Sequence, residues 1–222
     1  FGLPIVAQRP GLVPLRFAGE DWAPYADLAG VALPVRISTG EKKAAIAFDE
    51  DLLFTHRGLS GPAILQISSY WQPGQPLTID LLPHLDIAAA LQEAKASSKK
   101  QLPNLLAQWL PTRLAEAWCQ HTPAWQGPVN QCSDKALAQL AHSLSHWQIT
   151  PSGTEGYAKA EVTLGGVDTQ ALAQQSMQAK QQPGLFFIGE VVDITGWLGG
   201  YNFQWAWASA YACAQALQAA SA

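Results

Sequence analysis

Hydrophobic positions in the first part of the chain come in short runs rather than at helical spacing. These runs lie between residues 3 and 83 and are separated by Gly, Pro, Asp and Ser. Such a pattern predicts a small, mostly antiparallel sheet or barrel. The expected strands cover residues 12–17, 31–38, 43–48 and 77–82. Residues 58–67 break the pattern and predict a turn followed by a short helix.

Between residues 86 and 147 the apolar positions recur with the period of helices. Asp86, Thr112 and Ser133 each stand just before such a stretch, and their side chains suit the N-cap of a helix. We therefore expect a small helical bundle packed on the sheet. A segment rich in Gly, Ser and Thr at residues 149–157 then marks the main domain boundary.

The chain is thus expected to have an α+β fold with two domains. The first covers residues 1–150, with a β-rich part at 1–83 and a helical part at 86–147, and the second covers residues 151–222. In the second domain the pattern predicts a strand at 158–164, a Gly165-Gly166 turn, a polar segment with helical character at 169–180, an apolar strand at 185–188 and a long helix from about Asn202.

Composition bears on the class of partner and on the compartment. Only 14% of the residues are charged and the formal net charge is -4, so nucleic acid is not expected as a partner. No apolar stretch is long enough to span a bilayer, so no membrane partner is expected either. The three cysteines lack metal-ligand spacing, and their odd number is a poor disulfide framework. They indicate buried or free thiols in a reducing, cytoplasmic compartment.

The clearest chemistry lies in the stretch GLFFIGEVVD at residues 184–193 and in the glycines that follow it. An apolar strand that runs into Gly-Glu would place the Glu190 carboxylate at the end of a strand, where open α/β sheets bind ligands. Gly199 and Gly200 at the start of a helix would let backbone N–H groups approach a planar ligand and stabilise negative charge on it. The alternative is that Gly-Gly forms only a turn and Glu190 is a solvated loop acid.

Several motifs in order resemble one family, the YhiN/BaiN-like NAD(P)/FAD-dependent oxidoreductases. They are AEVTLGGV at residues 160–167 with Met177 and Lys180, GLFFIGEVVD at 184–193, GGYNFQWA at 199–206, FTHRGLSGP at 54–62 and GLVPL at 11–15. The resemblance covers essentially the whole chain. It implies a flavin fold of the two-dinucleotide-binding type that is interrupted by an inserted domain, which has a β-barrel-like part and a helical part.

The resemblance also implies three groups of cofactor-binding residues. They are the turn against the isoalloxazine ring, the Gly-Glu motif at the ribityl and phosphate part of FAD, and the helix-entry loop at the pyrimidine edge. In that order they comprise Gly165, Gly166 and Val167; Gly189 and Glu190, with Asp193 as a further ligand or a brace of the loop; and Gly199, Gly200, Tyr201 and Asn202.

In the family's chemistry, FAD would take hydride from NAD(P)H and pass it to a small organic acceptor held between the flavin domain and the inserted domain. Reduction of an activated C=C bond is the implied reaction. The GxGxxG turn that holds the FAD pyrophosphate is absent from this sequence. Phe1 begins the chain and Met177 is its only methionine, so we expect a fragment that lacks the N-terminal nucleotide-binding segment.

Such a fragment is expected to bind FAD weakly or not at all and to be inactive by itself. Its apolar strand at 185–188 and its last helix would lack the strands that they pack against. We therefore expect a partner chain, a swapped dimer or local disorder at this C-terminal segment.

His56 is the candidate for a proton donor or substrate contact from the inserted domain, because its neighbours supply a turn, hydroxyls and the positive charge of Arg57. The alternative is structural, with His56 and Ser60 binding loop backbone groups. Trp197, Trp205 and Trp207 lie near the expected flavin loop. They either contact a ligand or belong to the core.

A function of another class is also open: residues 1–150 could act as a binding or docking module without catalysis. A solvent-facing pocket with an exposed apolar rim on the inserted domain would favour that module. A groove that opens onto Gly165 and Gly199 would favour the enzyme.

Overall fold

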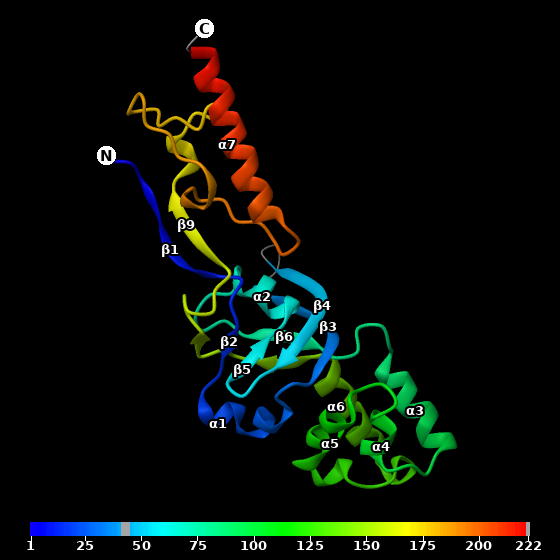
Figure 1. The fold of residues 1–222 in the computed structure, drawn as a ribbon. Coiled ribbons are helices and arrows are strands. Elements are labelled where there is room, and N and C mark those ends of the chain that lie inside the picture. The colour runs from blue at the N-terminus through cyan, green and yellow to red at the C-terminus, as the bar shows by residue number, and fades with distance from the viewer. Residues whose placement is uncertain (41–44, 221–222) are drawn as a thin grey trace. The chain divides into compact units, whose positions relative to one another are not determined.

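The computed structural model describes residues 1–40 and 45–220. The chain divides into two compact units, Pro14–Thr154 and Phe1–Val13 with Glu155–Ala222. We call them the sheet–helix unit and the terminal unit; both can be followed in Figure 1. The observed architecture confirms the expected α+β class, with antiparallel sheets and separate helices.

A seven-stranded sheet forms one part of the sheet–helix unit. Its strand order is β7-β6-β3-β4-β5-β2-β8, and every neighbouring pair is antiparallel. Alternate residues of β3, among them Leu33, Val35 and Ile37, are buried, as expected for a strand with one face on a core. The strands are β2 (Leu15–Arg16), β3 (Ala32–Thr39), β4 (Ile46–Phe54), β5 (Gly58–Ser60), β6 (Leu77–Asp80), β7 (Trp147–Ile149) and β8 (Gly153–Thr154).

Of the four predicted strands, those at 31–38 and 77–82 correspond to β3 and β6, whereas β5, β7 and β8 were not predicted as strands. The run at 12–17 yields only the two residues of β2, and the run at 43–48 begins in residues outside the described part of the chain. The expected turn and short helix at 58–67 correspond to β5 followed by α2 (Pro62–Ser68). A Cβ atom at Gly58 would lie 2.1 Å from the carbonyl oxygen of Leu15, so this close strand pairing requires glycine.

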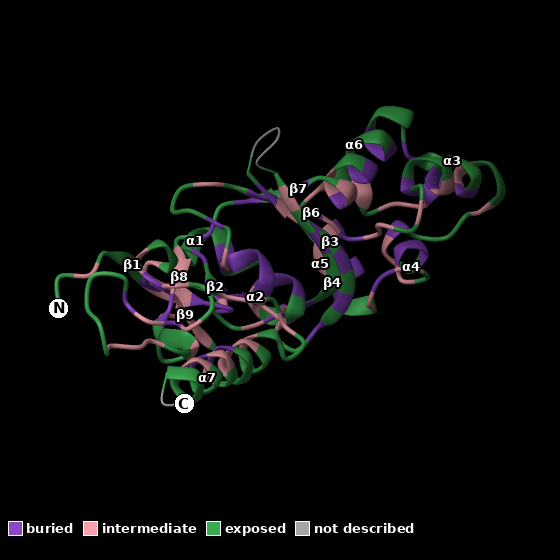
Figure 2. Ribbon diagram, turned by 90° about the horizontal axis from the view of Figure 1, so that it is seen from above, coloured by how far each residue is buried: buried purple, intermediate pink, exposed green. Residues whose placement is uncertain are grey.

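Helices form the other part of this unit and share one hydrophobic core with the sheet. Figure 2 shows buried residues on α2 and the sheet, and along one side of α3 and α6. Residues such as Leu91, Leu114 and Leu140 join one buried cluster with Ile37 and Ile79 of the sheet. Besides α2, the α-helices are α3 (Ile87–Ser97), α4 (Leu102–Leu106), α5 (Thr112–Gln120) and α6 (Asp134–Ser145), and α1 (Gly19–Trp22) leads into a 3-10 helix (Ala23–Leu28).

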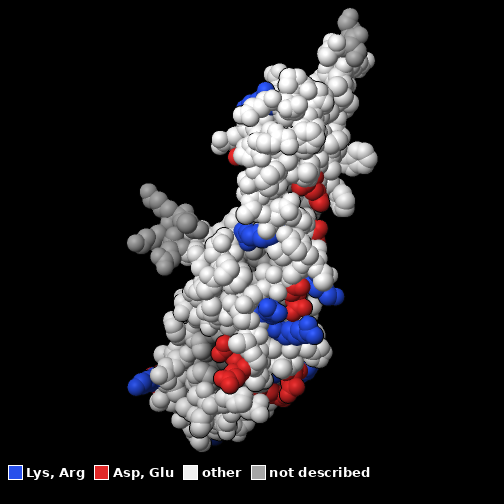
Figure 3. Space-filling model, turned by 90° about the vertical axis from the view of Figure 1, so that its left-hand side faces the viewer, with Lys and Arg blue, Asp and Glu red and all other residues white. Residues whose placement is uncertain are grey.

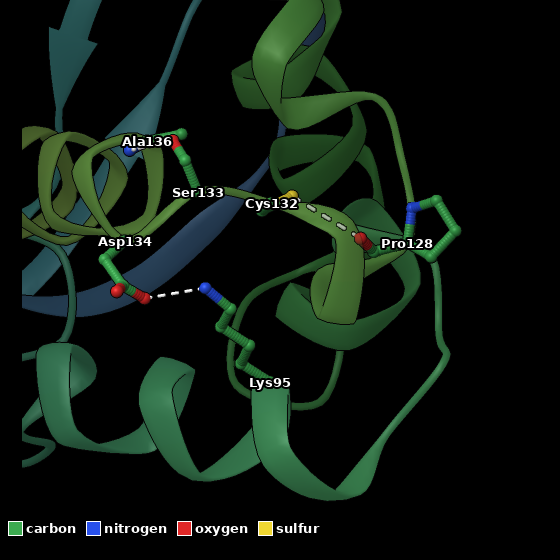
Figure 4. Close-up of polar contacts among 6 residues, drawn as sticks. All are labelled: Lys95, Pro128, Cys132, Ser133, Asp134 and Ala136. Atoms are coloured by element: carbon green, nitrogen blue, oxygen red, sulfur yellow. Dashed lines mark hydrogen bonds and ion pairs between the residues drawn. The ribbon is translucent and has the colours of Figure 1, made fainter.

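Two of the three predicted caps are confirmed. The Asp86 carboxylate accepts the Ala89 N–H at 3.0 Å, and the Ser133 hydroxyl accepts the Ala136 N–H at 3.2 Å. Figure 4 shows Ser133 at the start of α6, with the Lys95 ammonium donating to the next residue, Asp134, at 2.7 Å. The third cap is wrong, because Thr112 is the first helical residue and follows a proline at the cap position.

The terminal unit consists of a strand pair, a long loop and one long helix. β1 (Ile5–Gly11) and β9 (Val162–Val167) are antiparallel, and α7 (Tyr201–Ala220) ends the described chain. The sequence expectation placed the first residues with residues 14–150, whereas pairing with β9 brings β1 into the terminal unit. The two-domain assignment by sequence stays a prediction about the longer protein.

Three expectations for the terminal unit are wrong. Gly165 and Gly166 form no turn but lie within β9, where Gly166 pairs with Val6 of β1. Residues 169–180 form no α-helix beyond a 3-10 turn, because Met177 has a φ of +61°, and the chain folds back so that Ala173 and Gln178 share a hydrogen bond. Residues 185–188 form no strand. They make a single bridge, between Phe186 and Gln178, since no strand of the described chain lies along them to form a ladder.

No helix within residues 1–40 and 45–220 combines the length and the apolar character that crossing a bilayer requires.

Candidate functional site

The loop at residues 189–193 lies against the end of β9, where its two glycines, Gly165 and Gly166, are. The Asp193 N–H donates to the Val167 carbonyl at 2.9 Å, and Val192 and Val167 form a parallel bridge. A Cβ atom at Gly166 would lie 2.4 Å from the Val191 carbonyl oxygen. The structure therefore brings together the first two groups of predicted cofactor residues.

Gly189 is held on the other side by α7. Its N–H donates to the Ser209 hydroxyl at 2.9 Å, and its carbonyl accepts the Trp205 indole N–H at 3.0 Å. Ser209 is buried, although its hydroxyl is polar, because it both accepts this amide and donates to helix carbonyls. Sequence reasoning did not assign Ser209, and its one signal was its position one helical turn after Trp205.

The entry to α7 is fixed by one asparagine. The Asn202 side chain accepts the Gly196 N–H at 2.8 Å and donates to the Gly196 carbonyl at 3.2 Å. Gly199 and Gly200 have φ values of +112° and +91°, and a Cβ atom at Gly200 would meet nothing within 4 Å. The third predicted group is thus an ordered loop with open space at Gly200, next to helix amides that lack intrahelical acceptors.

These details distinguish the glycines that fit a planar cofactor from those that packing explains. At Gly165 a Cβ atom would lie 2.4 Å from the Ala7 carbonyl oxygen, so both glycines of β9 are required by contacts inside the unit. At Gly200 no protein atom accounts for the glycine beyond its backbone angle, and the open side fits the approach of a ring edge.

Glu190 does not lie where the sequence placed it. It is exposed and belongs to a 3-10 turn (Gly189–Val191), rather than to the end of a strand. Its carboxylate remains available to hydroxyl groups of a ligand. The side chain of Asp193 instead borders a hollow of about 700 Å³ beside α7, together with Trp205 and Ser209.

The other tryptophans of this region differ in their surroundings. Trp205 packs against the buried cluster of the terminal unit. Trp197 and Trp207 are exposed at 49% and 75%. Of the three, only Trp205 fits the core alternative.

The loop that carries His56 is ordered by its neighbour Thr55. The Thr55 hydroxyl donates to the Gly58 carbonyl at 2.9 Å and accepts the N–H groups of Gly58 and Arg57 at 3.1 and 3.4 Å. This bonding leaves His56 exposed. The backbone-binding role that the structural alternative gave to His56 and Ser60 thus falls to Thr55.

All three cysteines are buried free thiols, which confirms that expectation. Burial, with a smaller contribution from Cys132, raises the pKa of the Cys119 thiol to about 12. Such a thiol stays protonated at neutral pH and is a poor nucleophile.

Comparison with known proteins gives one family and several relatives. The family described as HI0933-like protein barrel and H2TH domain matches residues 9–162. The chain is 51% identical to the ribosomal RNA dihydrouridine synthase of Escherichia coli over 99% of its length and 48% identical to the protein of that name from Haemophilus influenzae over 96%. It is 26% identical to the 3-dehydro-bile acid delta(4,6)-reductase of Clostridium scindens over 93%. The chain spans about half the length of these relatives, 53–54%.

Proposed function

This chain belongs to the HI0933-like family, as the YhiN/BaiN-like motifs indicated, and from that premise we propose that it works within a longer flavoprotein that reduces uridine in ribosomal RNA. The observation that carries this proposal is the identity of about half of all residues, over nearly the whole chain, to two proteins named for that activity. A relative named for a bile acid is much less similar, at 26%. RNA is therefore favoured over a small-molecule substrate.

The names of the relatives have one reaction type in common. Dihydrouridine differs from uridine by two hydrogens on the C5–C6 bond, and that double bond is conjugated to the C4 carbonyl. A delta(4,6) double-bond system beside a 3-keto group is conjugated in the same way. Both reactions add a hydride to the carbon far from the carbonyl and a proton to the near one, which agrees with the expected reduction of an activated C=C bond.

The flavin, as FAD, would supply the hydride after reduction by NAD(P)H. In this chain the loop at Gly199 and Gly200 would hold the pyrimidine edge of the ring, and the first amides of α7 would stabilise negative charge there. Asn202 keeps that loop in place through both polar atoms of Gly196. His56 is the candidate donor of the proton, because hydrogen bonds of Thr55 order its loop and the residue is exposed.

The proposal departs from the expectation that nucleic acid is not a partner. That expectation rested on a net charge of -4, which averages over the entire chain. Figure 3 shows one face on which basic and acidic side chains are interspersed and neither sign gathers into a broad patch. We infer that RNA bound on this face would be held mainly by contacts to bases rather than by a wide basic surface.

The flavin proposal is tested by an absorbance spectrum and an FAD titration of two proteins. One is the 222-residue chain, and the other is the same chain joined to the nucleotide-binding segment of its longer relatives. Only the longer protein is expected to bind FAD and show the two visible flavin bands. If neither protein binds FAD, the flavoprotein proposal fails.

The substrate is tested with the longer protein, NAD(P)H and ribosomal RNA that lacks the modification. Mass spectrometry of the digested RNA should show nucleosides that have gained two hydrogens. The His56→Gln variant should bind RNA equally well and reduce it about 100-fold or more slowly, because general acid catalysis contributes about 10²–10⁴ in rate. Unmodified RNA after incubation with a protein that binds flavin would contradict the RNA substrate.

A non-catalytic docking module is the second candidate. Its criterion is met in part, because a hollow with aromatic walls on the sheet–helix unit faces solvent, whereas the rim of that hollow is polar rather than apolar. The groove that would favour the enzyme was expected to open onto Gly165 and Gly199. The hollow beside α7 is not that groove, because neither glycine lines it. The same RNA assay separates the two candidates, since a docking module would bind RNA without reducing it.

A further inference from the structure

The sheet–helix unit contains a pocket of about 380 Å³ whose walls are aromatic. Tyr25, Trp118 and Trp125 are half-buried around it, and Trp147 is buried at 7% exposure. These residues come from the 3-10 helix after α1, from α5, from the 3-10 turn that follows it and from β7. Chain segments distant in sequence thus present aromatic side chains to one hollow.

The rings are fixed by bonds that leave the hollow itself open. The Trp118 indole N–H donates to the Ser143 hydroxyl at 3.0 Å, and the Trp125 indole N–H donates to the Ala136 carbonyl at 3.1 Å. Trp147 packs edge-on to Trp118, with ring centroids 5.3 Å apart, and lies 5.0 Å from Tyr25. Because the polar atoms of the two half-buried indoles bind protein atoms, apolar ring surface remains for a ligand.

The rim of the pocket is polar and exposed. It includes His121, His146 and Gln148. The His146 ring is oriented by a hydrogen bond of 2.8 Å between its Nδ1 and the Ser145 hydroxyl. Rigid aromatic walls with hydrogen-bonding groups at the mouth suit a flat heterocycle, whose faces are apolar and whose edges carry donors and acceptors.

We propose that this pocket binds one unpaired base of the RNA, apart from the uridine that is reduced. The inference rests on the proposed function for the identity of the ligand as RNA. Its size agrees, since 380 Å³ lies near the lower end of the about 300–1,000 Å³ typical of small-ligand sites. Proteins that recognise single-stranded RNA commonly stack bases on Tyr, Trp and His side chains.

We assign the pocket to recognition rather than chemistry, because its walls are aromatic rings and His56, the candidate proton donor, does not line it. By holding such a base, the pocket would select RNA that has an unpaired base near the uridine to be reduced. Loss of the pocket is therefore expected to raise KM for RNA and leave kcat unchanged.

The test uses Trp125→Leu, with Trp109→Leu as the matched control. Trp109 is also a half-buried tryptophan in the helical part, and it does not line this pocket. The first probe is a short single-stranded oligoribonucleotide with a fluorescent label, titrated against the 222-residue chain. The Trp125→Leu change should weaken binding about tenfold or more, as expected for the loss of one stacked base, and Trp109→Leu should not.

A second variant guards against misfolding. His121 is exposed, so His121→Ala should keep the urea midpoint of the parent and still weaken binding of the oligonucleotide. The same oligonucleotide annealed into a duplex should bind more weakly than the single strand. Equal binding of the single strand by the parent and by both pocket variants would overturn the proposal. It would also be overturned if the parent bound an apolar peptide in this pocket and bound no RNA.

The longer, flavin-bound protein separates this inference from the proposed function. If it reduces uridine and Trp125→Leu has an unchanged KM for RNA, the pocket proposal fails and the proposed function stands. If the pocket variants lose single-strand binding but no uridine is reduced, the pocket proposal stands and the proposed reaction fails.

Discussion

At the scale of single residues, Gly166 gives the clearest prediction about stability. Its φ is +133°, and a Cβ atom there would lie 2.4 Å from the Val191 carbonyl oxygen. We expect Gly166→Ala to lower the free energy of unfolding of the terminal unit by at least about 1–3 kcal/mol, since both backbone strain and overlap act on it. Urea denaturation followed by circular dichroism measures this change.

Gly156→Ala is the control for backbone strain alone. Gly156 also has a positive φ, +72°, but a Cβ atom there would meet nothing within 4 Å. This variant should lose about 1–2 kcal/mol at most. Equal losses in the two variants would show that the contact between Gly166 and Val191 is not what requires glycine.

At the scale of elements, α7 presents an aromatic face to solvent. Phe203, Trp207 and Tyr211 follow one another at four-residue spacing and are 78%, 75% and 68% exposed. Residues four apart lie on the same side of a helix, so the three rings form one stripe. Monomeric proteins rarely expose such a stripe, which continues to indicate a partner chain or a dimer for this segment.

We expect the 222-residue chain to associate through this stripe. Replacing all three residues by Gln should weaken self-association by about 2 kcal/mol or more, since aromatic anchors at interfaces are each worth about 1 kcal/mol or more. Light scattering after size exclusion measures the association. Tyr157→Gln is the control, because Tyr157 is 58% exposed in the same unit but lies outside α7. A parent chain that stays monomeric at high concentration would contradict the expectation.

At the scale of the whole molecule, the division into two units predicts separate folding. The main buried cluster lies entirely within Pro14–Thr154, and β2 pairs with β8 so that Leu15 and Thr154 from opposite ends of the unit are in register. A chain of residues 14–154 should therefore unfold cooperatively, with a free energy within the usual range of about 5–15 kcal/mol. Denaturation followed by near-ultraviolet circular dichroism measures it.

The complementary piece, residues 155–222, should stay largely unfolded. It lacks β1, and among the described residues of the terminal unit β9 has no other strand partner. A lone strand with one helix buries too little apolar surface for independent stability. Cooperative folding of residues 155–222 would show that this piece does not need β1, and failure of residues 14–154 to fold would show that the sheet–helix unit depends on the terminal unit.

A structural feature of this protein could be predicted from the sequence when it depends on residues that lie close together along the chain. Asp86 and Ser133 cap their helices as expected, because a cap is a bond between neighbours three residues apart. Residues 185–188 are as apolar as a strand but form none, because a strand needs a neighbouring segment in register. The flavin candidates of β9 and of residues 189–193 were found from motifs, whereas Ser209, which holds Gly189, was not.

The sequence by itself determined the α+β class, the order of sheet and helices, the long last helix and the family motifs. These depend on local periodicity, capping and residue identity, which a linear pattern carries. Only the tertiary structure decided that β1 pairs with β9, that Gly165 and Gly166 are required by backbone contacts, and that Tyr25, Trp118, Trp125 and Trp147 line one pocket. Each of these joins residues separated by long stretches of chain, and packing of the folded core fixes such contacts.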